Sequence, residues 1–191
     1  HLLGRARFRR AEIGLRLASE MLAGEAAYVT PSYRTHGEMF SGATPIPAED
    51  IPHSTGELLV LANPNNPDGA IHDREALLAR PGWLLIDEAF ADTHPEVSVA
   101  NRVGGDRQLI VFKSFGKFFG LAGLRLGFVL GPREIVSHFR AKLGAWPVSA
   151  AAIAIGTAAY RDDGWIAAMR AQLPQEAAAL DAMLLRRGYQ P

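Results

Sequence analysis

Asn66, Asp87 and Lys117 each lie at or just beyond the end of a short apolar run, where a polar side chain can meet a ligand. The three runs are Leu58–Ala62, Trp83–Ile86 and Leu109–Phe112. Runs this short and this apolar predict buried strands. Ligands of open α/β sheets bind outside the carboxyl ends of the strands, so we expect the three residues to converge on one crevice.

Each of these residues suits a different polar group of a ligand. The Asn66 amide can donate a hydrogen bond to a ligand oxygen, and it lies in a proline-bounded turn that would fix it. A partly buried Asp87 would favour a protonated, positively charged partner. The hydroxyl of Ser114 and the forked cation of Arg125, on either side of Lys117, suit a phosphate.

Lys117 stands among three phenylalanines, with glycines on both sides. We expect Phe115, Phe118 and Phe119 to desolvate its amine and favour nucleophilic use. Taken singly, each segment also has a structural explanation, as a tight turn, a helix cap or a solvated lysine. The ordered set fits one cofactor, pyridoxal phosphate. This cofactor needs an amine for its aldehyde, a carboxylate for its pyridine nitrogen, a donor to its phenolate oxygen and a cradle for its phosphate.

From Ala27 onward, short apolar runs alternate with turns and amphipathic stretches, which predicts an α/β fold. We expect a mostly parallel sheet with helices on both faces. The predicted strands are Ala27–Val29, Leu58–Ala62, Trp83–Ile86, Leu109–Phe112 and Leu126–Leu130. The predicted helices are Asp73–Ala79, Pro132–Leu143, a buried helix Ala150–Tyr160 and a long amphipathic helix Trp165–Arg187.

This pattern divides the chain into three parts. Residues 1–26 are an N-terminal helical segment, residues 27–164 a cofactor-binding large domain, and residues 165–191 a long helix that leads toward a small domain. We expect that small C-terminal domain to be absent from this chain. The arginine-rich N-terminal segment suggests a transit peptide or a binding patch. However, Leu15, Leu17 and Leu22 continue a helical apolar pattern behind it. A solvated helix face is therefore the favoured interpretation of Arg5, Arg7, Arg9, Arg10 and Arg16.

The composition excludes several classes of partner. Twenty Lys and Arg balance twenty Asp and Glu over 191 residues, so no electrostatic footprint points to nucleic acid or to an anionic membrane. No apolar run approaches the roughly 18 residues that a membrane-spanning helix requires. With no cysteine, and with histidines far from the spacing of zinc motifs, we expect no metal site. A cytoplasmic protein with a small-molecule substrate is expected.

The motifs resemble those of the fold-type I pyridoxal-phosphate enzymes of the aminotransferase class I/II family, over roughly residues 27–188. The segment Asn63–Gly69 is similar to that family's Asn-Pro-x-Gly motif, and Ser114–Lys117 is similar to its Schiff-base motif. The resemblance implies that Lys117 attaches the cofactor covalently and that Asp87 pairs with its pyridine nitrogen. It also implies that Asn66 bonds the phenolate oxygen.

The same resemblance assigns five further residues to cofactor binding. Ser114 and Arg125 would hold the phosphate, Tyr33 would stack on the ring, and Ala89 and Phe90 would lie beside it. Phe90 replaces a tyrosine that many relatives use to bond the phenolate oxygen. Two further departures concern segments rather than single residues. Leu17–Gly24 lacks the Gly/Ser loop that cradles the phosphate, and we expect the arginine that grips the substrate carboxylate to belong to the small C-terminal domain, outside this sequence.

Among subgroups, Asp87–Asp92, Ser114–Gly127 and Trp146–Ser149 resemble the threonine-phosphate decarboxylases of cobalamin biosynthesis. This implies a pyridoxal-phosphate-dependent lyase that converts O-phospho-L-threonine, a small phosphorylated amino acid, to 1-amino-2-propanol phosphate. It also implies a homodimer. Two alternatives stay open at this point. One is a histidinol-phosphate-type aminotransferase, which would use the same lysine, and the other is a truncated, non-catalytic module with the same fold.

Overall fold

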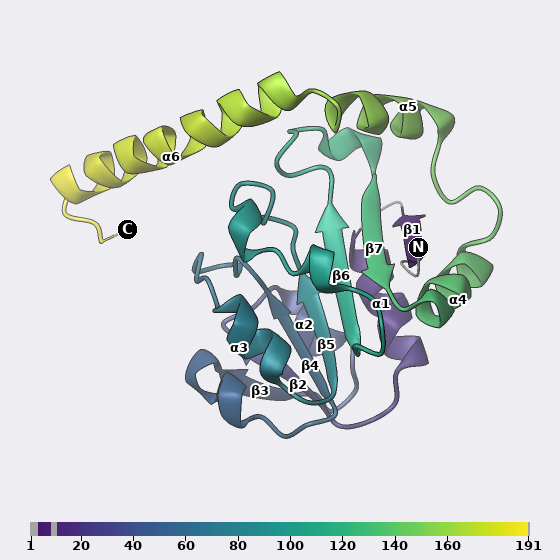
Figure 1. Cartoon of the computed structure of the whole chain (residues 1–191). Helices are drawn as coiled ribbons and strands as arrows, with labels where there is room; N and C mark the ends of the chain where they lie inside the picture. Colours follow the sequence, from purple (N-terminus) through teal and green to yellow (C-terminus); the bar gives the residue numbers. More distant parts are fainter. Residues whose placement is uncertain (1–3, 9–10, 191) are drawn as a thin grey trace. The chain divides into compact units, whose positions relative to one another are not determined.

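The computed structural model describes residues 4–8 and 11–190, with side chains described from Glu12 onward. Seven strands within these residues form one sheet, in the order β1-β7-β6-β5-β4-β2-β3 (Figure 1). The strands are β1 (Gly4–Phe8), β2 (Ala26–Thr30), β3 (Thr44–Pro47), β4 (Leu58–Ala62), β5 (Trp83–Asp87), β6 (Leu109–Ser114) and β7 (Gly127–Gly131). Strands β2 to β6 run parallel, whereas β7 is antiparallel to both β6 and β1. The predicted α/β fold with a mostly parallel sheet is confirmed.

The α-helices of the described residues are α1 (Ala11–Met21), α2 (Arg34–Glu38), α3 (Arg74–Ala79), α4 (Arg133–Leu143), α5 (Ala150–Ala159) and α6 (Asp163–Arg186). Helix α3 begins where the sequence predicts, because the Asp73 carboxylate accepts a hydrogen bond from the Ala76 amide at 2.7 Å. Helix α4 follows Pro132, whose fixed backbone angle suits a helix start. Both helices therefore follow their sequence signals closely.

Helices cover both faces of the sheet, as predicted, and each face has its own hydrophobic core. Successive side chains of a strand point to opposite faces, so Leu58 and Leu59 of β4 lie in different cores. On the face of Leu58 lie Leu15 of α1 and Phe139 of α4, both fully buried. On the face of Leu59 lies Leu77 of α3. Burial on both faces is why β4 is apolar throughout.

Two strands were not predicted, and both lie at the edges of the sheet. Strand β3 contains Pro45 and Pro47, which an edge position tolerates but which weaken any strand signal. Strand β1 contains Arg5 and Arg7, so residues 4–8 differ from the helical segment expected there. Arg9 and Arg10 lie outside the described residues. Arg16 is exposed on α1, as expected for a solvated helix face.

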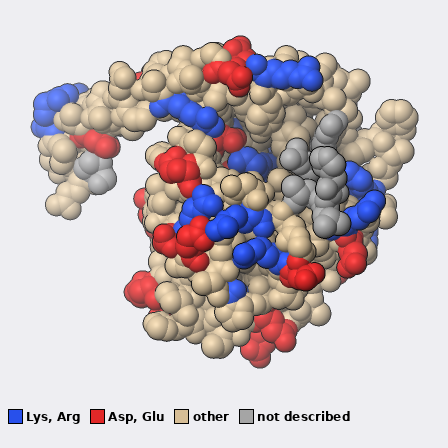
Figure 2. Space-filling model, in the orientation of Figure 1, with Lys and Arg blue, Asp and Glu red and all other residues tan. Residues whose placement is uncertain are grey.

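The chain divides into two compact units, His1–Ile153 and Ala154–Pro191. Helix α5 spans this division, and its Ile153 and Ile155 are 37% and 42% exposed, so the predicted burial of this helix is wrong. Helix α6 is continuous through Pro174. No helix among the described residues is both long enough and apolar enough to cross a membrane. Basic and acidic side chains are interspersed on the face seen in Figure 2, in keeping with the balanced charge.

Candidate active site

A cavity of about 330 Å³ lies at the carboxyl ends of β4, β5 and β6. Neighbouring parallel strands end at the same edge of a sheet, so the loops that follow them meet there. All eight residues that the sequence singled out line this cavity: Tyr33, Asn66, Asp87, Ala89, Phe90, Ser114, Lys117 and Arg125. The volume is within the range of small-molecule sites. The structure therefore brings the predicted residues together, while their individual roles stay predictions.

Asp87 is the last residue of β5 and is only 7% exposed. Its Oδ1 accepts a hydrogen bond from the Ala89 amide at 3.0 Å. Its Oδ2 lies 3.6 Å from Nε2 of His36, a fully buried residue of α2 that the sequence argument missed. A buried carboxylate at a cavity wall favours a positively charged ligand group.

Two lysines lie near the end of β6, and their surroundings differ. The amine of Lys113 lies 3.3 Å from Glu88 Oε2 and 3.0 Å from Asp92 Oδ1, so two carboxylates hold it. The amine of Lys117 lines the cavity and lies 5.4 Å from the centroid of the Phe90 ring. A cation over an aromatic face is attracted by the ring quadrupole. Lys117 is thus the amine placed to meet a ligand.

The predicted desolvation of Lys117 by the phenylalanines around it is wrong. Phe115 stacks on Phe119 with ring centroids 4.6 Å apart, and Phe118 meets Phe119 edge-on at 5.2 Å. These rings are buried, whereas Lys117 is exposed to the cavity. The turn after β6 directs its apolar side chains inward and its amine outward, and spacing along the sequence does not reveal that division.

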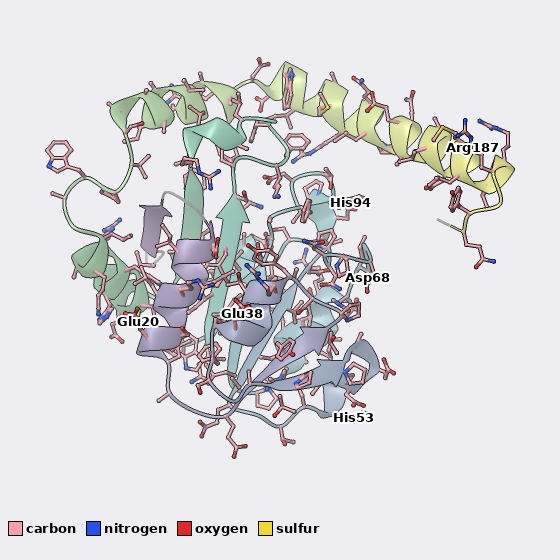
Figure 3. The ribbon with its side chains drawn as sticks, turned by 180° about the vertical axis from the view of Figure 1, so that it is seen from behind. Glu20, Glu38, His53, Asp68, His94 and Arg187 are labelled. Atoms are coloured by element: carbon pink, nitrogen blue, oxygen red, sulfur yellow. The ribbon has the colours of Figure 1, made fainter. Side chains whose placement is uncertain are left out.

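Asn66 lies on a loop that is held in place by hydrogen bonds from two neighbouring asparagines, Asn63 and Asn65. The Asn63 amide donates to the His72 carbonyl at 3.1 Å, and its oxygen accepts from the His72 amide at 3.0 Å. The Asn65 amide donates to the Pro31 carbonyl at 2.9 Å and to Asp68 at 2.8 Å. Figure 3 labels Asp68 on this loop. The turn is therefore structural at Asn63 and Asn65, while Asn66 lines the cavity.

The same loop contains two groups whose pKa values are shifted. The N–H of Ala70, which donates to the carboxylate at 3.0 Å, holds the pKa of Asp68 below its usual range, and the Asn65 amide adds to this effect. Burial lowers the pKa of His72, because an imidazolium loses hydration there. The nearby Asp68 opposes that shift only in part.

Ser114 and Arg125 reach the cavity because of a close approach at Gly116. A Cβ atom at position 116 would lie 2.8 Å from the Cα of Ala122, so the turn that follows Ser114 packs directly against the segment that leads to Arg125. Arg125 has a left-handed backbone, with φ of 53°, and its guanidinium donates to the Ala122 carbonyl at 2.8 Å. The hydroxyl and the guanidinium therefore line one cavity, as a bound phosphate requires.

Sequence reasoning missed several residues that belong to this site or support it, among them Ala62, Ala122 and Leu126 of the cavity lining. Glu12, in the first turn of α1, and Gly116 both line the cavity, and His36 lies behind Asp87. Among the side chains described from Glu12 onward, the first turn of α1 reaches the cavity and the segment Leu17–Gly24 does not. His36 carries a weak signal, since it lies three residues after Tyr33 and thus on the same side of a helical turn. Glu12 carries none.

Comparison with known proteins finds relatives named threonine-phosphate decarboxylase and relatives named histidinol-phosphate aminotransferase. A threonine-phosphate decarboxylase of Sinorhizobium sp is 46% identical over 134 residues, which are 66% of this chain and 40% of that protein. The threonine-phosphate decarboxylase of Pseudomonas aeruginosa is 37% identical over 184 residues, 88% of this chain and 54% of that protein. A chloroplastic histidinol-phosphate aminotransferase of Nicotiana plumbaginifolia is 33% identical over 132 residues, 68% of this chain and 32% of that protein. The chain thus spans about half the length, or less, of these curated relatives.

Solved structures show the same fold. The histidinol-phosphate aminotransferase of Clostridium acetobutylicum matches with a TM-score of 0.85 at 20% identity, covering 97% of this chain and 62% of that one. The enzyme of the same name from Sinorhizobium meliloti, solved in complex with pyridoxal-5'-phosphate, matches with a TM-score of 0.84 at 19% identity, covering 98% of this chain and 58% of that one. The family model for aminotransferase class I and II matches residues 48–191. The chain therefore belongs to the aminotransferase class I and II family.

Proposed function

We propose that this chain is the cofactor-binding part of a pyridoxal-phosphate-dependent lyase that decarboxylates O-phospho-L-threonine. One observation carries the proposal: Lys117, Asp87 and Asn66 lie at or just beyond the ends of three neighbouring parallel strands and line one cavity. Two relatives named threonine-phosphate decarboxylase, at 46% and 37% identity, support the choice of reaction. The solved relative with bound pyridoxal-5'-phosphate supports the choice of cofactor.

The residues present fit this cofactor. The cavity wall has a buried carboxylate with one oxygen held by the Ala89 amide and the other turned toward His36, which suits a protonated ring nitrogen. The close approach at Gly116, which a Cβ would block, brings Ser114 and Arg125 to the same cavity, which suits a phosphate. Tyr33, 37% exposed, places an aromatic side chain at the cavity wall.

Each residue has a defined part in the proposed reaction. When bound, pyridoxal phosphate supplies an electron sink for the charge left on Cα as carbon dioxide departs. Lys117 provides the amine that attaches the cofactor and afterwards the acid that returns a proton to Cα. Asp87 keeps the ring nitrogen protonated, and Asn66 donates to the phenolate oxygen. Ser114 and Arg125 orient the cofactor through its phosphate.

The cofactor assignment is tested by trapping. The protein is incubated with pyridoxal phosphate and reduced with borohydride, and the labelled peptide is identified by mass spectrometry. We expect the label on Lys117 and its loss in Lys117→Ala. The matched control is Lys142→Ala, because Lys142 lies on α4 with a half-exposed side chain and outside the cavity lining. A label on another lysine in the wild-type protein refutes the assignment.

The reaction is tested with O-phospho-L-threonine as substrate. Release of carbon dioxide supports the lyase, whereas amino transfer to 2-oxoglutarate supports the second candidate, a histidinol-phosphate-type aminotransferase. That candidate is favoured by the Nicotiana relative at 33% identity. Absence of any cofactor label would instead support a non-catalytic module. The homodimer and the cobalamin pathway implied by the resemblance stay predictions, and so does the cytoplasmic location expected from the composition.

A further inference from the structure

Glu12 is a charged residue of the cavity wall to which the proposed reaction assigns no part. Among the described side chains, four charged ones line the cavity: Glu12, Asp87, Lys117 and Arg125. In the proposed function Asp87 meets the ring nitrogen, Lys117 the aldehyde and Arg125 the phosphate. Glu12 is thus a second carboxylate on the wall of a site that is proposed to take an anion. Like charges repel, so its place there requires an explanation.

The ion pair that Glu12 makes is weak and shared. Its Oε1 lies 3.5 Å from Nη2 of Arg16, and the same nitrogen lies 3.5 Å from Oε2 of Glu38, which Figure 3 labels. The side chains of Glu12, Arg16 and Glu38 are 32%, 49% and 46% exposed. Exposed pairs of this kind contribute only about 0–1 kcal/mol. Because one guanidinium serves two carboxylates, the charge of Glu12 is only partly cancelled and still acts on the cavity.

A helical role for Glu12 differs from a role in the cavity in one measurable way. Glu12 lies in the first turn of α1, where a carboxylate stabilises a helix through the amides of that turn. That interaction does not depend on the charge of a ligand. A carboxylate on the cavity wall also acts on a charged ligand, since salt screens charges only over about 8–10 Å. The two roles are therefore separated by ligands that differ in charge alone.

We propose that Glu12 is a specificity-determining residue of the cavity, whose carboxylate opposes a phosphate there and lowers the affinity for phosphorylated ligands. Ser114 and Arg125 attract the phosphate, and Glu12 limits that attraction. A ligand of similar shape without the phosphate escapes the repulsion. The identity of the phosphorylated ligand rests on the proposed function, whereas the sign of the effect rests on the charges that line the cavity.

The test compares two ligands that differ only in the phosphate, pyridoxine 5'-phosphate and pyridoxine. Neither has an aldehyde, so neither can attach to Lys117. Dissociation constants are measured by isothermal titration calorimetry at low salt. Glu12→Gln should bind pyridoxine 5'-phosphate about two- to fivefold more tightly, the size of an exposed charge interaction, and should bind pyridoxine as the wild type does. Glu12→Asp, which keeps the charge, should resemble the wild type. The gain should shrink at about 1 M potassium chloride, where screening sets in within about 3 Å.

The matched control is Glu20→Gln, because Glu20 lies on the same helix, pairs with Lys142 at 3.3 Å and is outside the cavity lining. It should leave both dissociation constants unchanged. No gain in Glu12→Gln, an equal gain in the control or an equal gain for both ligands overturns the inference. If pyridoxal phosphate and borohydride leave no label on the wild-type protein, the proposed function fails by itself. Inorganic phosphate then serves as the probe, and equal affinities of wild type and Glu12→Gln for it overturn the inference too.

Discussion

Replacement of Lys113 by methionine should destabilise the protein strongly without touching the cavity. The Lys113 side chain is 16% exposed and lies between Glu88, 1% exposed, and Asp92, 11% exposed. Removing one partner of a buried ion pair costs about 3–5 kcal/mol, because a charge is left buried without compensation. Glu88 keeps hydrogen bonds from the Ser98 hydroxyl at 2.6 Å and the Val99 amide at 2.7 Å. We therefore expect the free energy of unfolding to fall by about 3 kcal/mol, the lower end of that range.

The assay is urea unfolding, with the free energy of unfolding extrapolated to water. For a chain of this size, the loss corresponds to a fall in melting temperature of roughly 6–12 °C. The matched control is Lys142→Met, because Lys142 also lies 3.3 Å from its partner, Glu20, but both side chains are about half exposed. An exposed pair of this kind contributes about 0–1 kcal/mol. Equal losses in the two variants would refute the reasoning, since burial would then not set the cost.

Three further predictions concern other parts of the chain. Asp73→Ala removes the cap of α3 and should lower the free energy of unfolding by about 1 kcal/mol in urea titrations, and an unchanged midpoint would contradict it. Gly116→Ala places a Cβ against the backbone of Ala122, so pyridoxal phosphate should bind several-fold more weakly. Gly123→Ala, which meets nothing within 4 Å, should bind normally. Because the folded-state pKa of His72 is lowered, its contribution to stability should be present above about pH 6.5 and lost as pH falls through the folded value. NMR titration of the imidazole tests this, and a midpoint at or above 6.5 would contradict it.

The central strands were predictable because they are buried on both faces. Strand β4 is apolar at every position, and its predicted bounds are those observed. The edge strands β1 and β3 were missed, because an edge strand is partly exposed and carries arginines or prolines in place of an apolar run. The start of α3 was predictable for a local reason, since a capping carboxylate needs only the next turn of its own chain.

The sequence alone identified Asn66, Asp87, Ser114, Lys117 and Arg125 as candidate site residues, because strand ends and motif spacing are local features of a chain. Only the tertiary structure showed that two carboxylates hold Lys113. It also decided that Glu12 lines the cavity and that His36 lies behind Asp87. The physical reason is that these contacts join segments far apart in the sequence. The direction in which a side chain points across such a contact is set by the packing of whole elements, not by its neighbours along the chain.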